Sequence, residues 1–351
     1  MLAPRFRDLG WEVSVVCIKE PGEMAPLFAR ERIKVDVIPF SSRWSPRSLY
    51  RLAKYFKEQQ TDIVHTHMYR PNTSGTAAAR LGGVKVVISH IHNVNHWDDF
   101  RQLFVDRMLA RHRDVIIAVS QGVRRNYLER ARVSADKVIA LYNGVDLETF
   151  SKGQFDAELA AGLGIQQGEK VVSIIARLHE QKRHVDFLAM AAEMLKQVPK
   201  ARFLIVGKGR LREQLEQKAR ELGIAQRCIF TGHRNDIAQM LALSDVAVSC
   251  SDKEGFSLSL IETLGAGVPI VATDVGGNAE AIVDGQSGFI VPPRRPDLLA
   301  QRVAELLTNH RLHKKISKCA VQRASIFSIE NMCKAIDRLY TELLSRHRRI
   351  Q

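Results

Sequence analysis

The chain has 351 residues, of which 45% are hydrophobic and 26% are charged, and its formal net charge is +14. This length exceeds the size at which a single hydrophobic core stops growing, so two domains are expected. No apolar run approaches the roughly 18 residues of a membrane-spanning helix, and the first residues lack the apolar core of a signal peptide. These features exclude an integral membrane protein and predict a cytoplasmic globular one.

The positive charge is spread evenly over the chain. Residues 1–150 carry 23 Lys and Arg against 16 Asp and Glu, and the remainder carries 29 against 22, so each part has a net charge of +7. No basic patch with interleaved aromatic residues is present, which argues against a nucleic-acid partner. Peripheral contact with anionic headgroups at the inner face of a membrane stays open, and a basic solvated surface explains the charge equally well.

The five cysteines are odd in number and have no metal-ligand spacing. This usage fits a reducing compartment better than a disulfide framework.

Strands and helices alternate along the first part of the chain. After the end of a helix at 2–9, apolar runs predict strands at 11–17, 33–38, 62–67, 85–89, 114–118 and 137–141. Between them, helices are expected at 46–59, 72–81, 98–111 and 121–130, the first of which starts with Ser45 as a cap and Pro46. Such alternation produces a parallel, doubly wound sheet with ligands at the carboxyl ends of its strands.

A second alternation follows residues 151–169, which are rich in Gly, Gln and Ala and are expected to form a linker. Its strands are expected at 170–175, 202–206, 228–231, 245–250, 269–273 and 288–291. The amphipathic segment 329–344 has no strand after it and can therefore pack across a domain boundary. The expected architecture is α/β, with two Rossmann-like doubly wound domains facing a cleft. They comprise residues 1–150 and 170–325, and a helix within 326–351 crosses back to the first domain.

The stretch from Glu254 to Gly277 has the layout of a ligand site. Glu254 lies in a loop after a buried strand, and the helix expected from Leu258 offers free N–H groups that suit a phosphate. A second carboxylate, Glu262, lies one to two turns into that helix. Glu262 has another interpretation, because Ser259-Leu-Ile-Glu262 matches a capping box. Glu254 has no comparable structural role.

Two cations follow the first strand of the second alternation. Arg177 and Lys182, facing the helix start at Phe256, would hold a diphosphate from both sides. An isolated pair of this kind is more often solvated, but its position before the Glu254 stretch favours a ligand. Gly207-Lys-Gly209 resembles a dinucleotide fingerprint without its third glycine. A tight turn also explains this signal, and the missing glycine argues against a nicotinamide-dependent dehydrogenase.

Five histidines follow two neighbouring strands of the first part. Taken singly, each is more often a structural residue than a catalyst, and their spacing does not dictate a metal site. They are His65, His67, His90, His92 and His96.

Several of these motifs occur together in one known family. They are Glu254-x7-Glu262, Gly265-x-Gly-x-Pro269, Val271-Ala-Thr-Asp-x-Gly-Gly277, Arg177-Leu-x3-Lys182 and Asn143-Gly-Val-Asp146. On these residues the chain resembles the group 1 (family 4-type) retaining glycosyltransferases of the GT-B fold, over nearly its whole length. The resemblance implies retaining transfer of a sugar from a nucleotide-diphosphate-sugar donor, without a metal or another cofactor. The acceptor, a glycan, lipid or small molecule, is unknown, and the expected setting is cell-surface polysaccharide or glycoconjugate synthesis.

The resemblance also assigns roles to individual residues. Glu254 contacts hydroxyls of the donor sugar, and Glu262 contacts the ribose. Arg177 and Lys182 neutralise the diphosphate, and His92 lies near the sugar and acceptor. The implied catalytic residues are Glu254 and His92, with no metal ligand. The implied donor-binding residues are Arg177, Lys182, Glu262, Gly255, Phe256, Ser257, Leu258, Gly207 and Arg234.

One departure from the family concerns the first domain. Members begin with a strand and a Gly-Gly loop, whereas this chain opens inside what would be the helix after them, so the domain is expected to lack its first strand. Two alternatives follow: an isomerase similar to UDP-N-acetylglucosamine 2-epimerase, and a non-catalytic remnant that binds a nucleotide-sugar or a partner. The two glutamates together with Arg177 and Lys182 favour sugar transfer.

Overall fold

The computed structural model describes residues 2–22, 24–42, 44–93, 99–151 and 153–348. Their contacts divide the chain into two compact units. Unit 1 consists of residues 1–143 and 329–351, and unit 2 consists of residues 144–328. All twelve strands expected from the sequence are present in the described residues, and every pair between them is parallel. The predicted α/β fold class is therefore confirmed.

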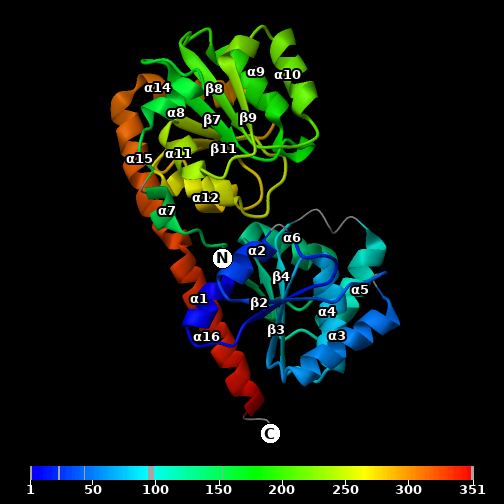
Figure 1. Cartoon of the computed structure of the whole chain (residues 1–351). Coiled ribbons are helices and arrows are strands. Elements are labelled where there is room, and N and C mark those ends of the chain that lie inside the picture. The colour runs from blue at the N-terminus through cyan, green and yellow to red at the C-terminus, as the bar shows by residue number, and fades with distance from the viewer. Residues whose placement is uncertain (1, 23, 43, 94–98, 152, 349–351) are drawn as a thin grey trace. The chain divides into compact units, whose positions relative to one another are not determined.

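Unit 1 contains two parallel sheets, shown in blue to green in Figure 1. One pairs β1 (Ser14–Cys17) with β2 (Lys34–Val37), and the other has the order β3 (Ile63–His67), β4 (Val86–Ile91), β5 (Val115–Ala118), β6 (Val138–Ala140). The helices are α1 (Leu2–Asp8), α2 (Ala25–Arg30), α3 (Pro46–Glu58), α4 (Tyr69–Leu81), α5 (Phe100–Ala110), α6 (Gln121–Ala131) and α16 (Ile329–Arg348).

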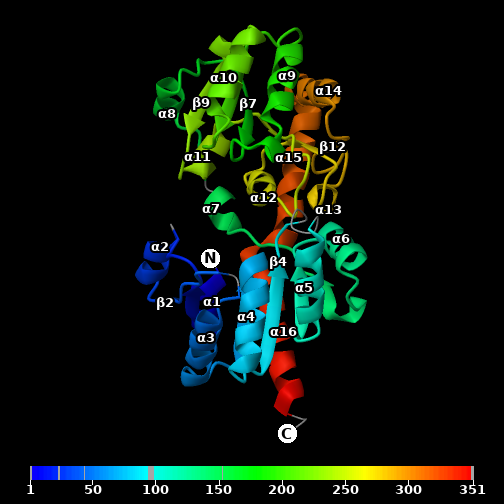
Figure 2. The same ribbon diagram turned by 90° about the vertical axis from the view of Figure 1, so that its right-hand side faces the viewer.

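Helix α16 completes the core of unit 1. Its Leu343 packs with the apolar side chains of β4 and β5, and its Ile336 is fully buried in a second cluster that includes Phe6 of α1. Trp11 Nε1 donates a 2.7 Å hydrogen bond to Asp337. Figures 1 and 2 show the helix, in red, running along this unit. The alternation of apolar and polar residues in α16 thus serves to cover a sheet.

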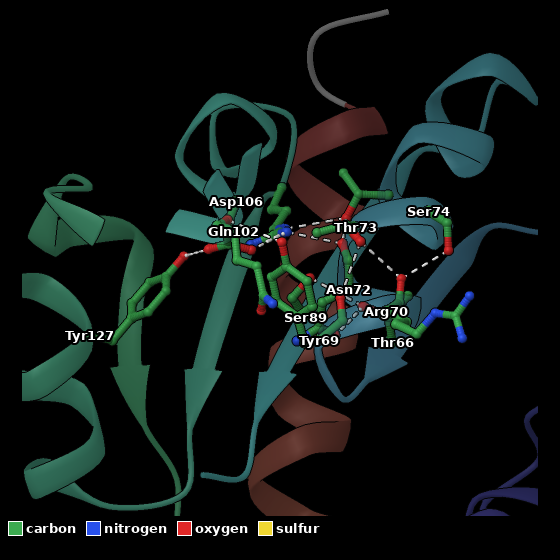
Figure 3. A network of polar contacts seen from close by, with 12 residues as sticks. Thr66, Tyr69, Arg70, Asn72, Thr73, Ser74, Ser89, Gln102, Asp106 and Tyr127 are labelled. Carbon is green, nitrogen blue, oxygen red and sulfur yellow. Dashed lines mark hydrogen bonds and ion pairs between the residues drawn. The ribbon is translucent and has the colours of Figure 1, made fainter. Parts of the chain in front are cut away.

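A buried polar network lies on the face of this sheet that is opposite to α16 (Figure 3). Arg113 donates to Asp106 at 2.8 Å and to the Asn72 carbonyl at 2.9 Å, and Tyr127 donates to Asp106 at 2.5 Å. The Asn72 side chain accepts from Thr66 at 2.8 Å and donates to the His90 carbonyl at 3.1 Å. Because every charge in the network is paired, α4 and strands β3 and β4 are fixed relative to one another.

Unit 2 contains one six-stranded parallel sheet with the order β12-β11-β10-β7-β8-β9. The strands are β7 (Lys170–Ile175), β8 (Ala201–Val206), β9 (Cys228–Gly232), β10 (Val246–Ser249), β11 (Ile270–Thr273) and β12 (Phe289–Val291). The helices are α7 (Leu147–Ser151), α8 (Ala157–Gly162), α9 (His184–Met194), α10 (Arg212–Glu221), α11 (Ile237–Ala242), α12 (Leu258–Gly265), α13 (Asn278–Ala281), α14 (Pro296–Thr308) and α15 (His310–Ala324).

The strand order places a topological switch point between β7 and β10. From β7 the chain proceeds through β8 and β9 on one side, then returns to add β10, β11 and β12 on the other. Loops that leave adjacent strands in opposite directions open a crevice at the carboxyl ends of these strands, where ligands of open α/β sheets bind. The loops after β7 and β10 are those that carry the predicted cations and Glu254.

The segment 151–169, expected to be a linker, contains helix α8 instead. The Asp156 side chain caps this helix by accepting a 2.9 Å hydrogen bond from the Leu159 N–H. Ala160 is buried against Val171 and Leu204 of the sheet. The small residues that were interpreted as linker composition allow a helix to pack closely on the sheet.

Candidate active site

The loop after β7 carries Arg177 and Lys182 and is held by the glycines of the β8 loop. Ala176 N–H donates to the Val206 carbonyl at 3.0 Å, and Leu178 N–H donates to the Lys208 carbonyl at 3.1 Å. Gly207 has φ +148°, and a Cβ atom on it would lie 2.0 Å from the Ala176 carbonyl oxygen. The absence of a side chain at Gly207 therefore lets the two backbones meet. Arg177 is exposed, with no ion pair to any described residue.

Lys182 and Glu254 meet across the switch point. The Lys182 ammonium forms an ion pair with the Glu254 carboxylate, which also accepts a 2.8 Å hydrogen bond from the Ser251 hydroxyl. Glu254 is 7% exposed. The backbones of the two loops also meet, since Asp252 N–H donates to the Gln181 carbonyl at 2.9 Å. The structure thus brings together two predicted site residues that lie 72 positions apart in the sequence.

The loop that carries Glu254 rests on the residues after β11. Thr273 donates to the Ser251 carbonyl at 2.7 Å, and Gly277 N–H donates to the Gly255 carbonyl at 3.1 Å. Gly276 has φ +53°, and a Cβ atom on it would lie 1.7 Å from the Glu254 carbonyl oxygen. The Val271–Gly277 motif therefore positions Glu254.

Helix α12 begins directly after this loop. The hydroxyl of its N-cap, Ser257, lies 3.2 Å from the Ser259 hydroxyl and accepts no hydrogen bond from a backbone N–H of the helix, so the N–H groups of the first turn remain available to an anion. A narrow cavity beneath the loops is lined by both partners of the ion pair and by polar side chains of the helix and its cap. These are Lys182, Glu254, Ser251, Ser257, Ser259 and Thr263.

Glu262 lies within helix α12 and is not part of a capping box. Because the N-cap is Ser257, Glu262 is the fifth helical residue, too far along to reach back to the N-cap N–H. Its carboxylate has no hydrogen bond or ion pair with any residue in the described parts of the chain. Burial raises its pKa to about 7. A half-buried carboxylate without a partner is suited to accept hydrogen bonds from a ligand.

The other predicted donor residues have different environments. Phe256 is buried and packs against Phe327 with ring centroids 5.2 Å apart, so its side chain serves the core. Gly255 and Ser257 are buried, and Leu258 is exposed. Arg234 lies after β9, where it forms an ion pair with Asp236 of its own loop.

His92 lies in unit 1, directly after β4. Its Nε2 atom is 2.9 Å from Nδ1 of His67, and its ring stacks on His90 with centroids 4.4 Å apart. Burial lowers its pKa to about 4, so the ring is neutral at physiological pH. His65 also belongs to this array, whereas His96 lies outside the described residues.

Sequence reasoning missed three features of these sites. Ser251 gave no signal, because a serine three residues before a glutamate is common. The contact of Gly276 with the Glu254 backbone had only one signal in the sequence, the glycine pair at the end of the Val271–Gly277 motif. The stacking of four histidines depends on the register of β3 and β4, which pairs His67 with His90 and is not readable from either strand alone.

Two family models together match most of the chain. Residues 156–323 match the glycosyl transferases group 1 model, and residues 1–149 match the glycosyltransferase family 4 model. The chain belongs to the group 1 glycosyltransferases. The family predicted from the motifs is therefore confirmed, and unit 2, with its switch-point site, contains the whole of the group 1 match.

Curated relatives of this glycosyltransferase match over most of their length. It is 25% identical to the Escherichia coli UDP-Gal:alpha-D-GlcNAc-diphosphoundecaprenol alpha-1,3-galactosyltransferase, over 95% of this chain and 90% of that protein. It is 26% identical to the Bacillus anthracis N-acetyl-alpha-D-glucosaminyl L-malate synthase, over 84% and 78% respectively.

Solved structures show that the fold is GT-B. The Anabaena protein Alr3699/HepE in complex with UDP superposes with a TM-score of 0.87 at 23% identity, covering 97% of this glycosyltransferase and 94% of that chain. The Thermosynechococcus elongatus sucrose-phosphate synthase superposes with a TM-score of 0.82 at 20% identity, covering 98% and 92%. At these identities the likeness shows the fold alone. None of the helices in the described part of the chain is both long and apolar enough to cross a bilayer.

Proposed function

We propose that this glycosyltransferase transfers a sugar from a nucleotide-diphosphate-sugar donor bound to unit 2, with retention of the anomeric configuration. The observation that carries the proposal is the meeting of Lys182 and Glu254 at the switch point, beside the free N-terminus of α12. The relatives support it, because the Escherichia coli enzyme is named for a UDP-galactose donor and HepE was solved with UDP. An epimerase is not favoured, since both matching family models describe transferases.

The charges of the site suit departure of a diphosphate. Negative charge develops on the leaving diphosphate as the sugar acquires oxocarbenium character. Lys182 and the exposed Arg177 supply two positive charges, and the N–H groups at the start of α12 supply further donors. We therefore propose that these residues neutralise the diphosphate without a metal. In the described part of unit 2, no cluster of three metal-ligating side chains lies at this edge of the sheet.

The two carboxylates have distinct proposed roles. Glu254 lines the cavity, where its carboxylate accepts hydrogen bonds from hydroxyls of the donor sugar. These hydrogen bonds replace part of its contact with Lys182. Glu262 accepts hydrogen bonds from the ribose hydroxyls. The ring of His92 in unit 1, which burial keeps neutral, is proposed to form a hydrogen bond with the substrate.

A panel of nucleotide-sugars tests the proposal. The protein is incubated with UDP-, GDP- and ADP-sugars in the presence of a chelator, and release of the nucleoside diphosphate is measured. We expect one donor to be hydrolysed slowly without an acceptor, and the anomeric configuration of the released or transferred sugar, read by NMR, to match the donor. Epimer formation without nucleotide release would contradict the proposal, and an inverted product would contradict retention.

We also propose that unit 1 binds the surface of an anionic membrane through helix α5. Phe100, Phe104 and Met108 are 74%, 64% and 41% exposed, and they share one helix face because they are four residues apart. Exposed arginines lie beside this stripe at 101, 107 and 111. An apolar face bordered by cations, in a chain of net charge +14, fits anionic headgroups over an acyl layer. An acceptor linked to a lipid, as in the Escherichia coli relative, would lie at such a surface.

Vesicle sedimentation tests the membrane proposal. We expect binding to vesicles that contain phosphatidylglycerol, weakening with salt, and little binding to pure phosphatidylcholine. Replacing Phe100 and Phe104 with Ser should reduce binding strongly. The matched control is Leu81→Ser, since Leu81 is 72% exposed on α4 and has no comparable stripe. Equal binding by the double variant and the parent would contradict the proposal.

A further inference from the structure

Four histidine rings are stacked on one face of the sheet in unit 1. Ring centroids are 4.5 Å apart for His65 and His67, 5.1 Å for His67 and His90, and 4.4 Å for His90 and His92. Their face is the one covered by α16, because His65 contacts Tyr340 of that helix. The proposed donor residues, by contrast, all lie in unit 2.

Two of these rings have buried nitrogens without partners. His90 is 0% exposed, and neither of its ring nitrogens has a hydrogen-bond partner among the described residues. Nε2 of His65 is also buried without a partner. Buried polar atoms are nearly always paired with protein, water or an ion, so these three nitrogens are open to a ligand. Charge repulsion is not an obstacle, since burial lowers the pKa of these histidines and keeps the rings neutral, which is the form that binds metals.

Ring nitrogens of three of these histidines lie close together. His65, His67 and His90 each offer one nitrogen, and these atoms all lie within 4.8 Å of one another. The ligand atoms of a tetrahedral zinc ion with Zn–N bonds of about 2.1 Å are about 3.4 Å apart. Side-chain movements on the order of 1 Å would therefore complete the coordination. The strands themselves need not move, because the network of Thr66 and Asn72 fixes them from the opposite face.

The neighbouring groups are compatible with the tautomers that a metal requires. Nδ1 of His65 is 2.6 Å from the Tyr340 hydroxyl, and Nδ1 of His67 is 2.9 Å from Nε2 of His92. When each Nδ1–H donates in these contacts, Nε2 of both His65 and His67 keeps its lone pair. Hydrogen bonds of this kind orient the histidine ligands of metal sites.

We propose that His65, His67 and His90 form a site for a divalent first-row transition metal, with zinc as the preferred ion. Three neutral imidazoles without a carboxylate match zinc, cobalt, nickel or copper better than magnesium or calcium, which prefer oxygen ligands. Three protein ligands leave a fourth position for water or an acceptor group. The site belongs to unit 1 and takes no part in neutralising the diphosphate, so it is independent of the proposed donor chemistry.

The first test is a cobalt titration of the full chain, prepared without a histidine tag and freed of metal by a chelator. We expect visible absorption bands typical of tetrahedral Co²⁺ that saturate at one ion per chain and disappear when Zn²⁺ is added. Zinc should also raise the melting temperature, since it binds the folded state. X-ray absorption at the zinc edge should show three imidazole ligands.

Variants locate the ion. Replacing His67 and His90 together with Gln should abolish the cobalt bands and the zinc-dependent rise in melting temperature. Tyr340→Phe should keep the stoichiometry and weaken metal affinity by about 10- to 100-fold, because it removes the partner of His65. The matched control is His184→Gln in unit 2. His184 is 2% exposed with both ring nitrogens buried and unpartnered, but among the described residues it belongs to no group of three metal-ligating side chains.

Three results would overturn the proposal. They are an absence of cobalt bands, bands that persist in the double histidine variant, and a zinc edge without imidazole ligands. The Tyr340→Phe and X-ray absorption measurements remain decisive if the double variant does not fold. None of these measurements depends on sugar transfer, so failure of the metal site and failure of the proposed transferase reaction are distinguishable.

Discussion

Both units have polar side chains at the carboxyl ends of parallel strands, but the side chains differ in charge. After β7 and β10 in unit 2, Lys182 and Glu254 form an ion pair. At the ends of β3 and β4 in unit 1, burial keeps four histidines neutral. A charged pair can exchange one partner for an anionic ligand, whereas neutral rings offer lone pairs and hydrogen bonds. The same topology thus supports two kinds of chemistry.

The largest effect is expected from Glu254→Gln, which removes the charge of the pair and keeps its shape. Turnover should fall by roughly 100- to 1,000-fold, as for removal of one group that stabilises a transition state. Donor affinity should change little, because the diphosphate and ribose contacts remain. Single-turnover kinetics and calorimetry measure the two quantities. The control Glu193→Gln changes an exposed glutamate of α9 in the same unit and should leave both unchanged.

Removing the cations should weaken donor binding instead. Arg177→Ala and Lys182→Ala each delete a charge-assisted contact worth about 1.5–3 kcal/mol, which corresponds to roughly 10- to 150-fold in affinity. Lys170→Ala serves as the control, because Lys170 lies at the opposite end of β7 in a half-exposed ion pair with Asp245. Calorimetric titration with the nucleoside diphosphate provides the measurement. If the control lost as much affinity as the two variants, the effect would be due to the overall positive charge of the protein and not to contacts in the site.

The carboxylate of Glu262 should make donor affinity depend on pH. Its pKa is raised to about 7, and ribose hydroxyls bind the ionised form more strongly. Affinity for a nucleotide-sugar should therefore rise by up to about tenfold per pH unit below pH 7 and level off above it. Binding below pH 7 should release a proton, which calorimetry in buffers of different ionisation enthalpy detects. An unaltered pH profile in Glu262→Gln would contradict the assignment.

A smaller effect is expected from Gly276→Ala. Both Gly276 and Gly285 have positive φ values, +53° and +70°, so alanine at either position costs about 1 kcal/mol or more in backbone strain. Only at Gly276 would the new Cβ atom meet the Glu254 carbonyl oxygen, whereas nothing lies within 4 Å at Gly285. Both variants should melt a few degrees lower. Only Gly276→Ala should also lose turnover, because it displaces Glu254.

Local patterns were sufficient to predict most of the fold. Apolar runs located all twelve described strands, and Ser45 caps α3 as expected, accepting from the Ser48 N–H. The capping box at Ser259 was wrong because the actual N-cap, Ser257, lies two residues earlier, at the end of the loop after β10. A four-residue pattern of this kind can also occur inside a helix. Helix α8 within the segment 151–169 was not predicted, because composition does not distinguish flexible small residues from small residues at a helix–sheet contact.

The candidate site was predictable only in part. The cations and glutamates could be identified because each follows a strand in a recognisable motif. Their pairing could not, since the contact of Lys182 with Glu254 depends on the strand order that makes β7 and β10 neighbours. The lack of a partner for Glu262 among the described residues could not be predicted either, because burial without a hydrogen bond is a property of the packed helix.

The position of α16 has a consequence for the order in which the chain acquires its structure during synthesis. Unit 2 is continuous in sequence, from 144 to 328, so all its strands have been made before α16 is translated. Unit 1 buries Ile336 and Leu343 of α16 against its sheets and must keep that apolar surface uncovered until the last segment emerges from the ribosome. Completion of unit 1 therefore requires a segment that is translated after all of unit 2. The sheet of unit 2 can form while unit 1, whose strands are made first, still lacks the helix that covers its sheet.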